Sequence, residues 1–276
     1  MMRKHPGTRL TALRLLACAA TLAAIIGPGS TASAAEPVSR DAAVHDLAPG
    51  GRLRIAINYG NAALAQRDTN GQLHGASVVL ARKLGERLGV PVDLIPYPAA
   101  GEVFKALDSG AWDVAFLAIE PERATRLDFS PPYVVIDGTY LVHRNAPFHQ
   151  AADLDRDGVR IAVSRGAAYD LFLSRTLKHA RLDRAASTPA AIQLFIDDKL
   201  DAAAGIRPAL VAVARTHPDL RVLDDSFKRI EQAMAVPKGH AAGAAYLRGF
   251  LQDMKRSGQI RAALIASGQS GDLVTP

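Results

Sequence analysis

The chain has 276 residues, of which 49% are hydrophobic and 22% charged, a composition typical of globular proteins rather than disordered or fibrous ones. Four of its 33 basic residues lie in the first 14 positions, and no acidic residue precedes Glu36, so the rest of the chain carries 29 basic and 27 acidic residues. This small excess, together with only 5% aromatic residues, gives no reason to expect a nucleic acid as a partner.

The first 34 residues have the pattern of a secretory signal peptide. A basic stretch precedes 13 residues without a charge, 15–27, and Ala32-Ser33-Ala34 follows as a small-residue cleavage pattern. The uncharged run is shorter than the roughly 20 residues that a membrane span needs. We therefore expect cleavage near Ala34 and a soluble mature protein in the periplasm. Cys18, the only cysteine, lies in the removed segment, so we expect no disulfide and no cysteine-bound metal.

Strands and helices alternate over the next 70 residues. Alternating apolar residues predict a strand at 53–57, and Asn70-Gly71 predicts a tight turn. Helical spacing of apolar residues over 79–88 is ended by Gly89 and Pro91. A strand at 92–97, a short helix up to Gly110 and a continuous apolar strand at 112–119 follow. This βαβαβ order predicts an open parallel sheet.

The same order starts again near Leu154 and predicts a second α/β core that is complete near Leu223. Strands are expected at 159–163, near Ala185 and at 201–206, with helices at 167–177 and after Thr188 and Pro208. Thr188 is the expected cap of its helix, with Pro189 at the first helical position. The remaining residues, a strand at 233–236 and helices beyond it, are too few for a third core, so we expect them to pack on the first two.

A ligand site is expected where the strands of these two sheets end. In open parallel sheets the ligand crevice lies beyond the carboxyl ends of the strands, where loops and helix N-termini gather. Arg123 follows such a strand end, in the first turn of a helix that Pro121 opens, and the free backbone N–H groups of that turn favour an anion. Residues 164–167 form a second turn of this kind, in which Gly166 permits close approach of the backbone.

At these positions the sequence resembles the family 3 periplasmic solute-binding proteins of ABC transporters, the polar amino acid binding type. The resemblance covers most of residues 47–270, and its most specific part comprises 110–114 (GAWDV), 119–123 (IEPER) and 128–133 (DFSPPY). It implies an α/β fold of two lobes, the type II periplasmic binding protein fold, in which each lobe is an open sheet flanked by helices and the chain crosses twice. The expected crossings lie near 139–143 and 232–236, and the expected lobes are 51–140 with 233–276, and 141–232.

The resemblance also implies roles for individual residues. Arg123 would bind a ligand carboxylate with help from the backbone at Ala118, and the turn at Gly166 and Ala167 would hold the ligand from the other lobe. Three departures weaken the expectation of an α-amino acid as ligand. The family often has Ser or Thr where this chain has Ala118, and Thr where it has Ala167. At Ile206, amino acid binders have the Asp that holds the ligand ammonium.

Other candidates have both a functional and a structural interpretation. Arg123 itself could be a surface arginine paired with Glu120 or Glu122. Tyr59 could form a wall of the ligand site or pack between the lobes, and Phe116 could reach the cleft from a mainly core position. Arg207 could enter the pocket or remain solvated.

The sequence thus predicts an extracytoplasmic protein that captures a small anionic or zwitterionic solute, an amino acid or an organic acid, and delivers it to an ABC transporter permease in the inner membrane. We expect a monomer without a cofactor, without a metal and without catalytic activity. The alternative is a periplasmic enzyme on the same scaffold, such as a dehydratase that acts on a cyclic carboxylate. Such an enzyme needs an acid or base in the cleft, and only Glu120 and Glu122 fall at the strand ends.

Overall fold

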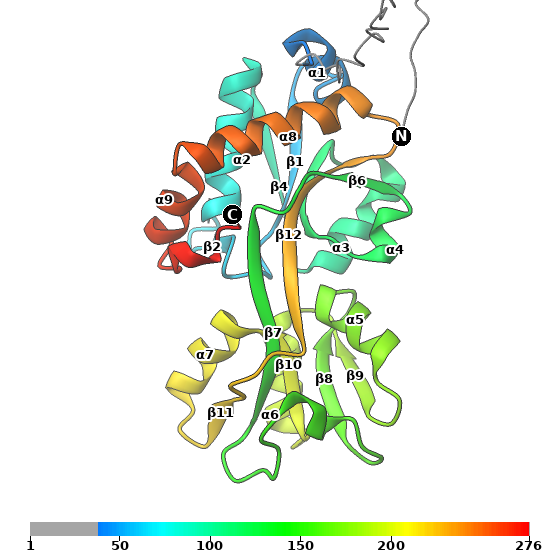
Figure 1. Cartoon of the computed structure of the whole chain (residues 1–276), viewed down its shortest axis with the longest axis vertical. Helices are drawn as coiled ribbons and strands as arrows, with labels where there is room; N and C mark the ends of the chain where they lie inside the picture. The colour runs from blue at the N-terminus through cyan, green and yellow to red at the C-terminus, as the bar shows by residue number, and fades with distance from the viewer. Residues whose placement is uncertain (1–37, 276) are drawn as a thin grey trace, which may run out of the picture. The chain divides into compact units, whose positions relative to one another are not determined.

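The computed structural model describes residues 38–275, which form two α/β lobes joined by two long strands (Figure 1). The expected signal peptide and its cleavage site lie outside the described residues. The lobes share one ten-stranded sheet, in which the order of the main path is β4-β1-β5-β12-β7-β10-β8-β9. The two-lobed fold expected from the sequence is confirmed.

The sheet of the first lobe is parallel at its outer edge, as the βαβαβ order predicts. Its strands are β1 (Leu53–Asn58), β4 (Val92–Tyr97), β5 (Val114–Ala118) and β6 (Leu127–Phe129). Strand β1 pairs in parallel with both β4 and β5, whereas β6 pairs with β12. A small hairpin of β2 (Gln66–Arg67) and β3 (Leu73–His74) follows β1, with the predicted turn at Asn70-Gly71 between its strands.

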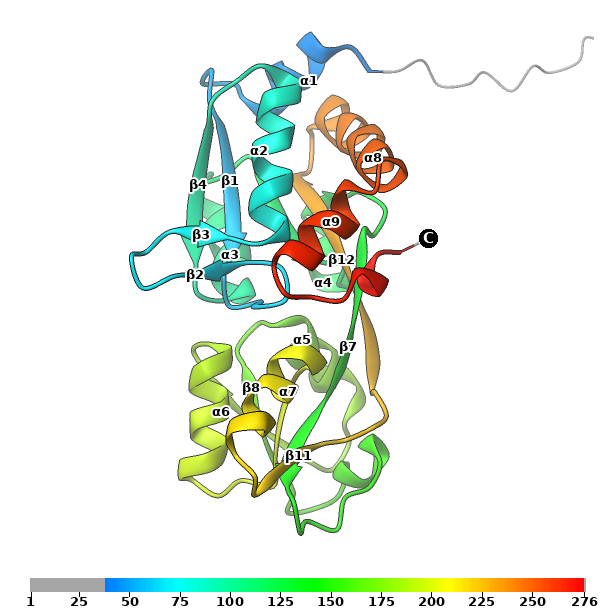
Figure 2. The same ribbon diagram turned by 90° about the vertical axis from the view of Figure 1, so that its left-hand side faces the viewer.

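Helices cover both faces of this sheet (Figure 2). They are α1 (Arg40–Leu47), α2 (Ala76–Leu88), α3 (Ala100–Lys105), α4 (Pro121–Ala124), α8 (Ala241–Arg256) and α9 (Gln259–Ala266), with 3-10 turns η1 (Ala106–Ser109) and η3 (Gly271–Leu273). Alternate residues of β5 explain this arrangement: Val114 and Phe116 belong to the core shared with α2 and α8, and Ala115 belongs to the core shared with α3. The helix α1 is not among the elements expected from the sequence.

The second lobe repeats the parallel pattern. Its strands are β8 (Arg160–Ser164), β9 (Arg181–Ala185), β10 (Ala202–Ile206) and β11 (Leu220–Val222), and its helices are α5 (Ala168–Thr176), α6 (Thr188–Asp197) and α7 (Arg207–Thr216), with a 3-10 turn η2 (Ala151–Leu154). Strand β8 pairs in parallel with β9 and with β10. Phe195 of α6 and Leu210 of α7 are fully buried in one core on this sheet.

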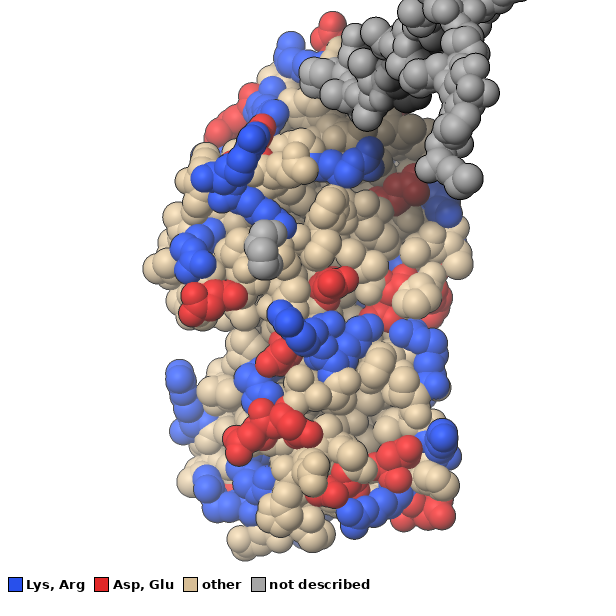
Figure 3. Space-filling view, viewed as in Figure 1, with Lys and Arg blue, Asp and Glu red and all other residues tan. Residues whose placement is uncertain are grey.

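Ion pairs connect the strands and helices at the surface of the second lobe, where acidic and basic side chains lie side by side (Figure 3). Asp183 of β9 accepts hydrogen bonds from Arg160 (2.8 Å) and Arg181 (3.0 Å). Asp170 of α5 accepts from Arg184 (2.9 Å) and from the backbone N–H of Gly166 (2.8 Å). The hydrogen bonds of Asp170 fix the turn between β8 and α5, which faces the first lobe.

Two antiparallel strands carry the chain between the lobes, β7 (Val134–His143) and β12 (Lys228–Pro237). They pair with each other at residues 134–138 and 228–232. Beyond these residues β7 pairs with β10 of the second lobe, and β12 pairs with β5 and β6 of the first. The crossings expected at 139–143 and 232–236 are therefore placed too far along the chain. Both strands continue without a break from one lobe into the other, so no change in sequence pattern marks the crossing itself.

The cap of α6 is also a correction. Ser187, not Thr188, is the N-cap, and its hydroxyl accepts a hydrogen bond from the backbone N–H of Ala190. Thr188 is the first helical residue, which leaves its hydroxyl free to bind elsewhere. None of the helices among the described residues combines the length and apolar character that a membrane span requires.

Candidate functional site

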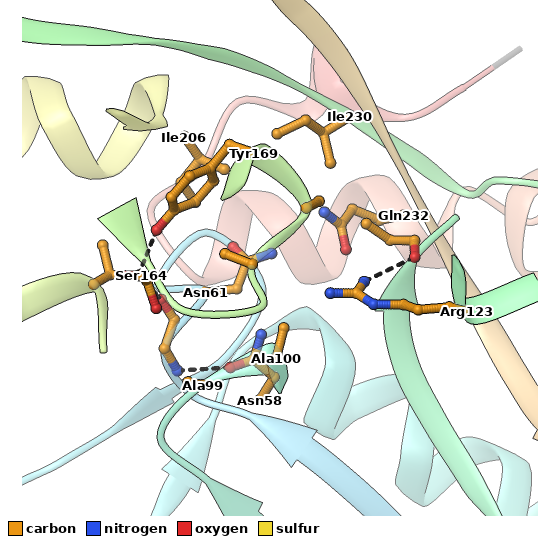
Figure 4. A pocket seen from close by; sticks show the side chains of 15 residues that line it. Asn58, Asn61, Ala99, Ala100, Arg123, Ser164, Tyr169, Ile206, Ile230 and Gln232 are labelled. Carbon is orange, nitrogen blue, oxygen red and sulfur yellow. Dashed lines mark hydrogen bonds between the residues drawn. The ribbon is translucent and has the colours of Figure 1, made fainter. Parts of the chain in front are cut away.

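A small pocket lies where the two lobes meet, lined by 15 residues from both lobes and from β12 (Figure 4). Its cavity volume is about 40 Å³. A single water takes up roughly 10–15 Å³ of such a cavity, so the pocket has room for a few small groups. Its dimensions suit a small molecule rather than a polymer.

Arg123 is the one charged side chain among the described residues that line this pocket. It belongs to the short helix α4, which Pro121 starts directly after β5 and Ile119-Glu120. Its side chain is only 1% exposed, so the alternative of a surface arginine is wrong. Desolvation by burial lowers the pKa of Arg123 to about 10, although the charges of Glu120 and Glu122 oppose this shift. The guanidinium therefore stays protonated at neutral pH.

The guanidinium of Arg123 connects the two lobes. Its Nη1 donates to the carbonyl oxygen of Ala118 (2.9 Å), and its Nη2 donates to the carbonyl oxygen of Gly166 in the second lobe (2.8 Å). Its Nε is buried and has no hydrogen-bond partner among the described residues. Guanidinium carries five N–H groups in a planar fork that matches a carboxylate, so this site retains donors for an anionic ligand.

The turn at Gly166 approaches the first lobe very closely. Gly166 has φ of +68°, and a Cβ atom placed on it would lie 2.8 Å from the Cα of Gly101 in α3. A Cβ atom on Gly101 would likewise lie 2.7 Å from the carbonyl oxygen of Arg165. Both distances are shorter than real Cβ atoms accept, so this contact between the lobes depends on glycine at both positions.

Neutral polar groups supply the rest of the polar lining. The hydroxyl of Thr188 lies 3.2 Å from that of Tyr169 and donates to the carbonyl oxygen of Gly60 across the lobes (3.3 Å). Asn61 follows β1, and its Oδ1 is buried without a hydrogen-bond partner among the described residues. Gln232 of β12 is 5% exposed and also lines the pocket.

Some of the residues expected from the sequence meet at this pocket. Ala118, Arg123 and Ala167 line it, and Gly166 contacts it through its hydrogen bond with Arg123. Ile206, the position of the missing Asp, also lines it. Asn58 and Ser164 also line it, at strand ends where the sequence places the ligand crevice. Four neutral polar residues of the lining are missing from the expected set: Asn61, Tyr169, Thr188 and Gln232. No sequence signal marks Asn61 or Gln232.

Three expected residues lie outside the pocket lining. Tyr59 is half-buried beneath the guanidinium of Arg67, at 5.8 Å from the ring centroid. Phe116 packs edge-on against Tyr133 within the core, with ring centroids 6.0 Å apart. Arg207, the first residue of α7, is directed toward the segment after β11. It donates to the carbonyl oxygens of Leu223, Asp224 and Asp225 and so holds that segment.

Glu120 forms a second connection between the lobes, beside the pocket. Its carboxylate is fully buried and accepts hydrogen bonds from Arg175 of α5, at 2.6 Å, and from Lys228 of β12. Both oxygens are therefore paired with cations outside the pocket lining. Among the described residues that line the pocket, Arg123 is the only charged one, and no Asp, Glu, His or Lys accompanies it. Within residues 38–275, no group of three or more His, Cys, Asp or Glu side chains could hold a metal ion.

Comparison with known proteins agrees with this geometry. The family model of bacterial extracellular solute-binding proteins, family 3, matches residues 53–265. The chain is 28% identical over 197 residues to the L-cystine-binding protein TcyJ of Escherichia coli K12, covering 70% of this chain and 73% of that protein. It is 24% identical over 255 residues to the cyclohexadienyl dehydratase of Pseudomonas aeruginosa PAO1, covering 90% and 91%.

Solved structures share the fold. A putative binding component of an ABC transporter from Wolinella succinogenes, complexed with lysine, matches with a TM-score of 0.69 and 25% identity. The match covers 77% of this chain and 94% of that one. The two-lobed architecture is therefore the one found in solved binding components of transporters.

Proposed function

Since the chain belongs to the bacterial extracellular solute-binding proteins of family 3, we propose that it captures a small carboxylate-bearing solute, an amino acid or an organic acid, between its lobes and delivers it to an ABC transporter permease in the inner membrane. The single observation that carries the proposal is Arg123: a buried guanidinium between the lobes, whose Nε has no hydrogen-bond partner in the part of the chain that the structure describes. A buried cation of this kind is costly unless an anion joins it.

The ligand would act as the link that holds the lobes together. Arg123 belongs to the first lobe, and the turn at Gly166 and Ala167 belongs to the second, so one small molecule contacts both only when the lobes are close. Closure would bend the paired strands at 134–138 and 228–232. One moving lobe would comprise about 51–140 with 233–276, and the other about 141–232. The ligand then shifts the population toward the closed form by its greater affinity for that form.

Binding without chemistry is the function that the lining supports best. General acid–base catalysis needs a titratable group beside the substrate, and the described lining offers only Arg123 and Tyr169 as ionisable side chains. Burial raises the pKa of the Tyr169 hydroxyl further above neutral. The likeness to a cyclohexadienyl dehydratase keeps the enzyme alternative open to test. A monomer in the periplasm, with the signal peptide removed near Ala34, completes the proposal.

The test is to identify what the protein carries. The mature chain is purified from native periplasm, its bound compound is released and identified by mass spectrometry, and the same compound is titrated back into the stripped protein. The proposal expects a small carboxylate that returns unchanged after incubation. Recovery of a chemically converted product would favour the enzyme, and recovery of a ligand without a carboxylate would contradict the proposal.

A further inference from the structure

We propose that the ligand is a small carboxylate that carries a neutral hydrogen-bond donor, a hydroxyl or an amide N–H, and no ammonium group, and that Asn61 selects this donor. The inference rests on the proposed function, because it assumes that the pocket at Arg123 binds the ligand. It narrows the solute from carboxylates in general to hydroxy acids and N-acylated amino acids.

Within residues 38–275, two polar atoms of the pocket lack hydrogen-bond partners, and one is a donor while the other is an acceptor. The Nε of Arg123 is a buried donor, and the Oδ1 of Asn61 is a buried acceptor. Figure 4 shows both side chains directed into the same space. Because buried polar groups in proteins are almost always paired, the two atoms indicate a ligand that accepts at one end and donates at the other.

Backbone hydrogen bonds on both sides of Asn61 fix the position of this residue in the site. The N–H of Asn61 donates to the carbonyl oxygen of Asn58 (3.3 Å), and its carbonyl oxygen accepts from Leu64 (2.9 Å) and Ala65 (3.0 Å). Leu64 and Ala65 are buried in the core of the first lobe. The loop thus presents the amide of Asn61 from a rigid turn, as a specificity-determining group requires.

The charge balance of the pocket excludes an ammonium group from this ligand. Arg123 contributes one positive charge, which a single carboxylate neutralises. A ligand ammonium would add a second positive charge beside it, and no carboxylate lines the pocket to pair with it among the described residues. The two buried carboxylates nearby are already committed, Glu120 to Arg175 and Lys228, and Asp170 to Arg184 and the N–H of Gly166. An unpaired buried charge is strongly unfavourable.

The other pocket residues accommodate a neutral donor group next to the ligand carboxylate. Ala118, Ala167 and Ile206 provide apolar walls. The hydroxyls of Tyr169 and Thr188 form a hydrogen bond with each other, so they do not need a charged ligand group as a partner. A ligand hydroxyl or amide N–H can donate a hydrogen bond to the Oδ1 of Asn61. Its burial does not carry the desolvation cost of an ammonium.

The test compares ligands that differ only at the carbon next to the carboxylate. Calorimetric titration and thermal shift are measured for propionate, lactate, alanine and N-acetylalanine, and for the matched series built on phenylalanine. We expect the hydroxy or N-acyl acid of at least one series to bind at least tenfold more tightly than the free amino acid. Asn61→Ala should lower the affinity for this hydroxy or N-acyl acid to that for the acid without a donor, propionate or its phenyl analogue.

Asn61→Asp should reverse the preference, because a carboxylate at this position would pair with a ligand ammonium. We expect the amino acid to gain at least tenfold in affinity and the hydroxy acid to lose. Asn70→Asp, which adds the same charge at an exposed turn of the β2–β3 hairpin, is the matched control and should change neither affinity. Circular dichroism and the melting temperature establish that each variant is folded.

The outcomes separate this inference from the proposed function. Tighter binding of amino acids by the unaltered protein, or an unchanged ranking in Asn61→Asp, overturns the inference alone. The proposed function fails together with this inference under two conditions: no carboxylate, whether tested or recovered from the protein, binds, and Arg123→Ala does not change the binding of the recovered compound.

Discussion

The carboxylate of Glu120 in the first lobe accepts a hydrogen bond of 2.6 Å from the guanidinium of Arg175 in the second. Glu120 is fully buried and lies three residues before Arg123, yet it does not line the pocket. The bond joins α5 to the segment before α4, so it exists only while the lobes are together. It therefore contributes to closure without contacting the ligand.

Loss of this bond should weaken ligand binding modestly. Because the side chain of Arg175 is 41% exposed, solvent screens the pair, and Arg175→Ala should lower affinity by about fivefold, or about 1 kcal/mol. Glu120 keeps Lys228 as a partner in this variant, so the fold should persist. Titration calorimetry with the recovered ligand measures the effect. Arg181→Ala, which removes another exposed arginine of the second lobe, is the control; equal affinities in the two variants would show that the Arg175 bond has no part in closure.

Gly101→Ala should prevent full closure while leaving the fold intact. Its Cβ would lie 2.7 Å from the carbonyl oxygen of Arg165 across the lobes, so the lobes must separate to make room. We expect at least a tenfold loss of affinity and a larger radius of gyration by small-angle scattering with ligand present. Alanine is also the better helix residue, so the free energy of unfolding should be unchanged or rise by about 0.5–1 kcal/mol.

The matched control for this substitution is Gly249→Ala in α8. A Cβ there meets nothing within 4 Å, so the same gain in helix propensity comes without contact with the second lobe. Ligand affinity and scattering should equal those of the unaltered protein. A Gly101→Ala protein that binds and compacts as well as this control would disprove the close contact between Gly101 and the turn at Gly166.

Carboxylate binding should depend on the protonation of Arg123. Burial lowers the pKa of Arg123 to about 10, so the guanidinium loses its charge at lower pH than an exposed arginine does. Affinity should be constant from about pH 7 to pH 9 and fall as the pH rises through about 10. Because the carboxylate favours the protonated form, binding near pH 10 should take up a proton, which calorimetry in buffers of different ionisation enthalpy detects. Constant affinity up to about pH 11, without proton uptake, would contradict this.

The sequence predicts a helix or strand well where a single periodic pattern of apolar residues extends over the whole element. The alternation at Leu53, Ile55 and Ile57 and the apolar run of β5 correspond to strands whose faces are covered by helices. Ser187 and Thr188 are both acceptable caps by residue type. In the structure Ser187 caps the helix, and Thr188 instead donates to the carbonyl oxygen of Gly60 in the other lobe. Long strands such as β7 carry no signal at the point where their partner changes.

The site is only partly predictable for a related reason. Arg123 stands out because a proline-opened helix follows a buried strand, and this arrangement is local. Asn61 lies in a loop with no periodicity, and only the structure shows that its Oδ1 is buried without a partner among the described residues. Arg207 illustrates the opposite error, because its strand-end position resembles that of Arg123 while its guanidinium binds three backbone carbonyl oxygens.

The most direct test of carboxylate binding between the lobes is calorimetric titration of the recovered acid into Arg123→Ala and its neighbour Arg126→Ala. A hydrogen bond to a charged group is worth about 1.5–3 kcal/mol, so Arg123→Ala should lower affinity about 10- to 150-fold. Arg126 is exposed and pairs with Asp108, so its removal should leave affinity unchanged. Equal affinity of the two variants for the acid would contradict the assignment of Arg123 as the residue that holds the ligand.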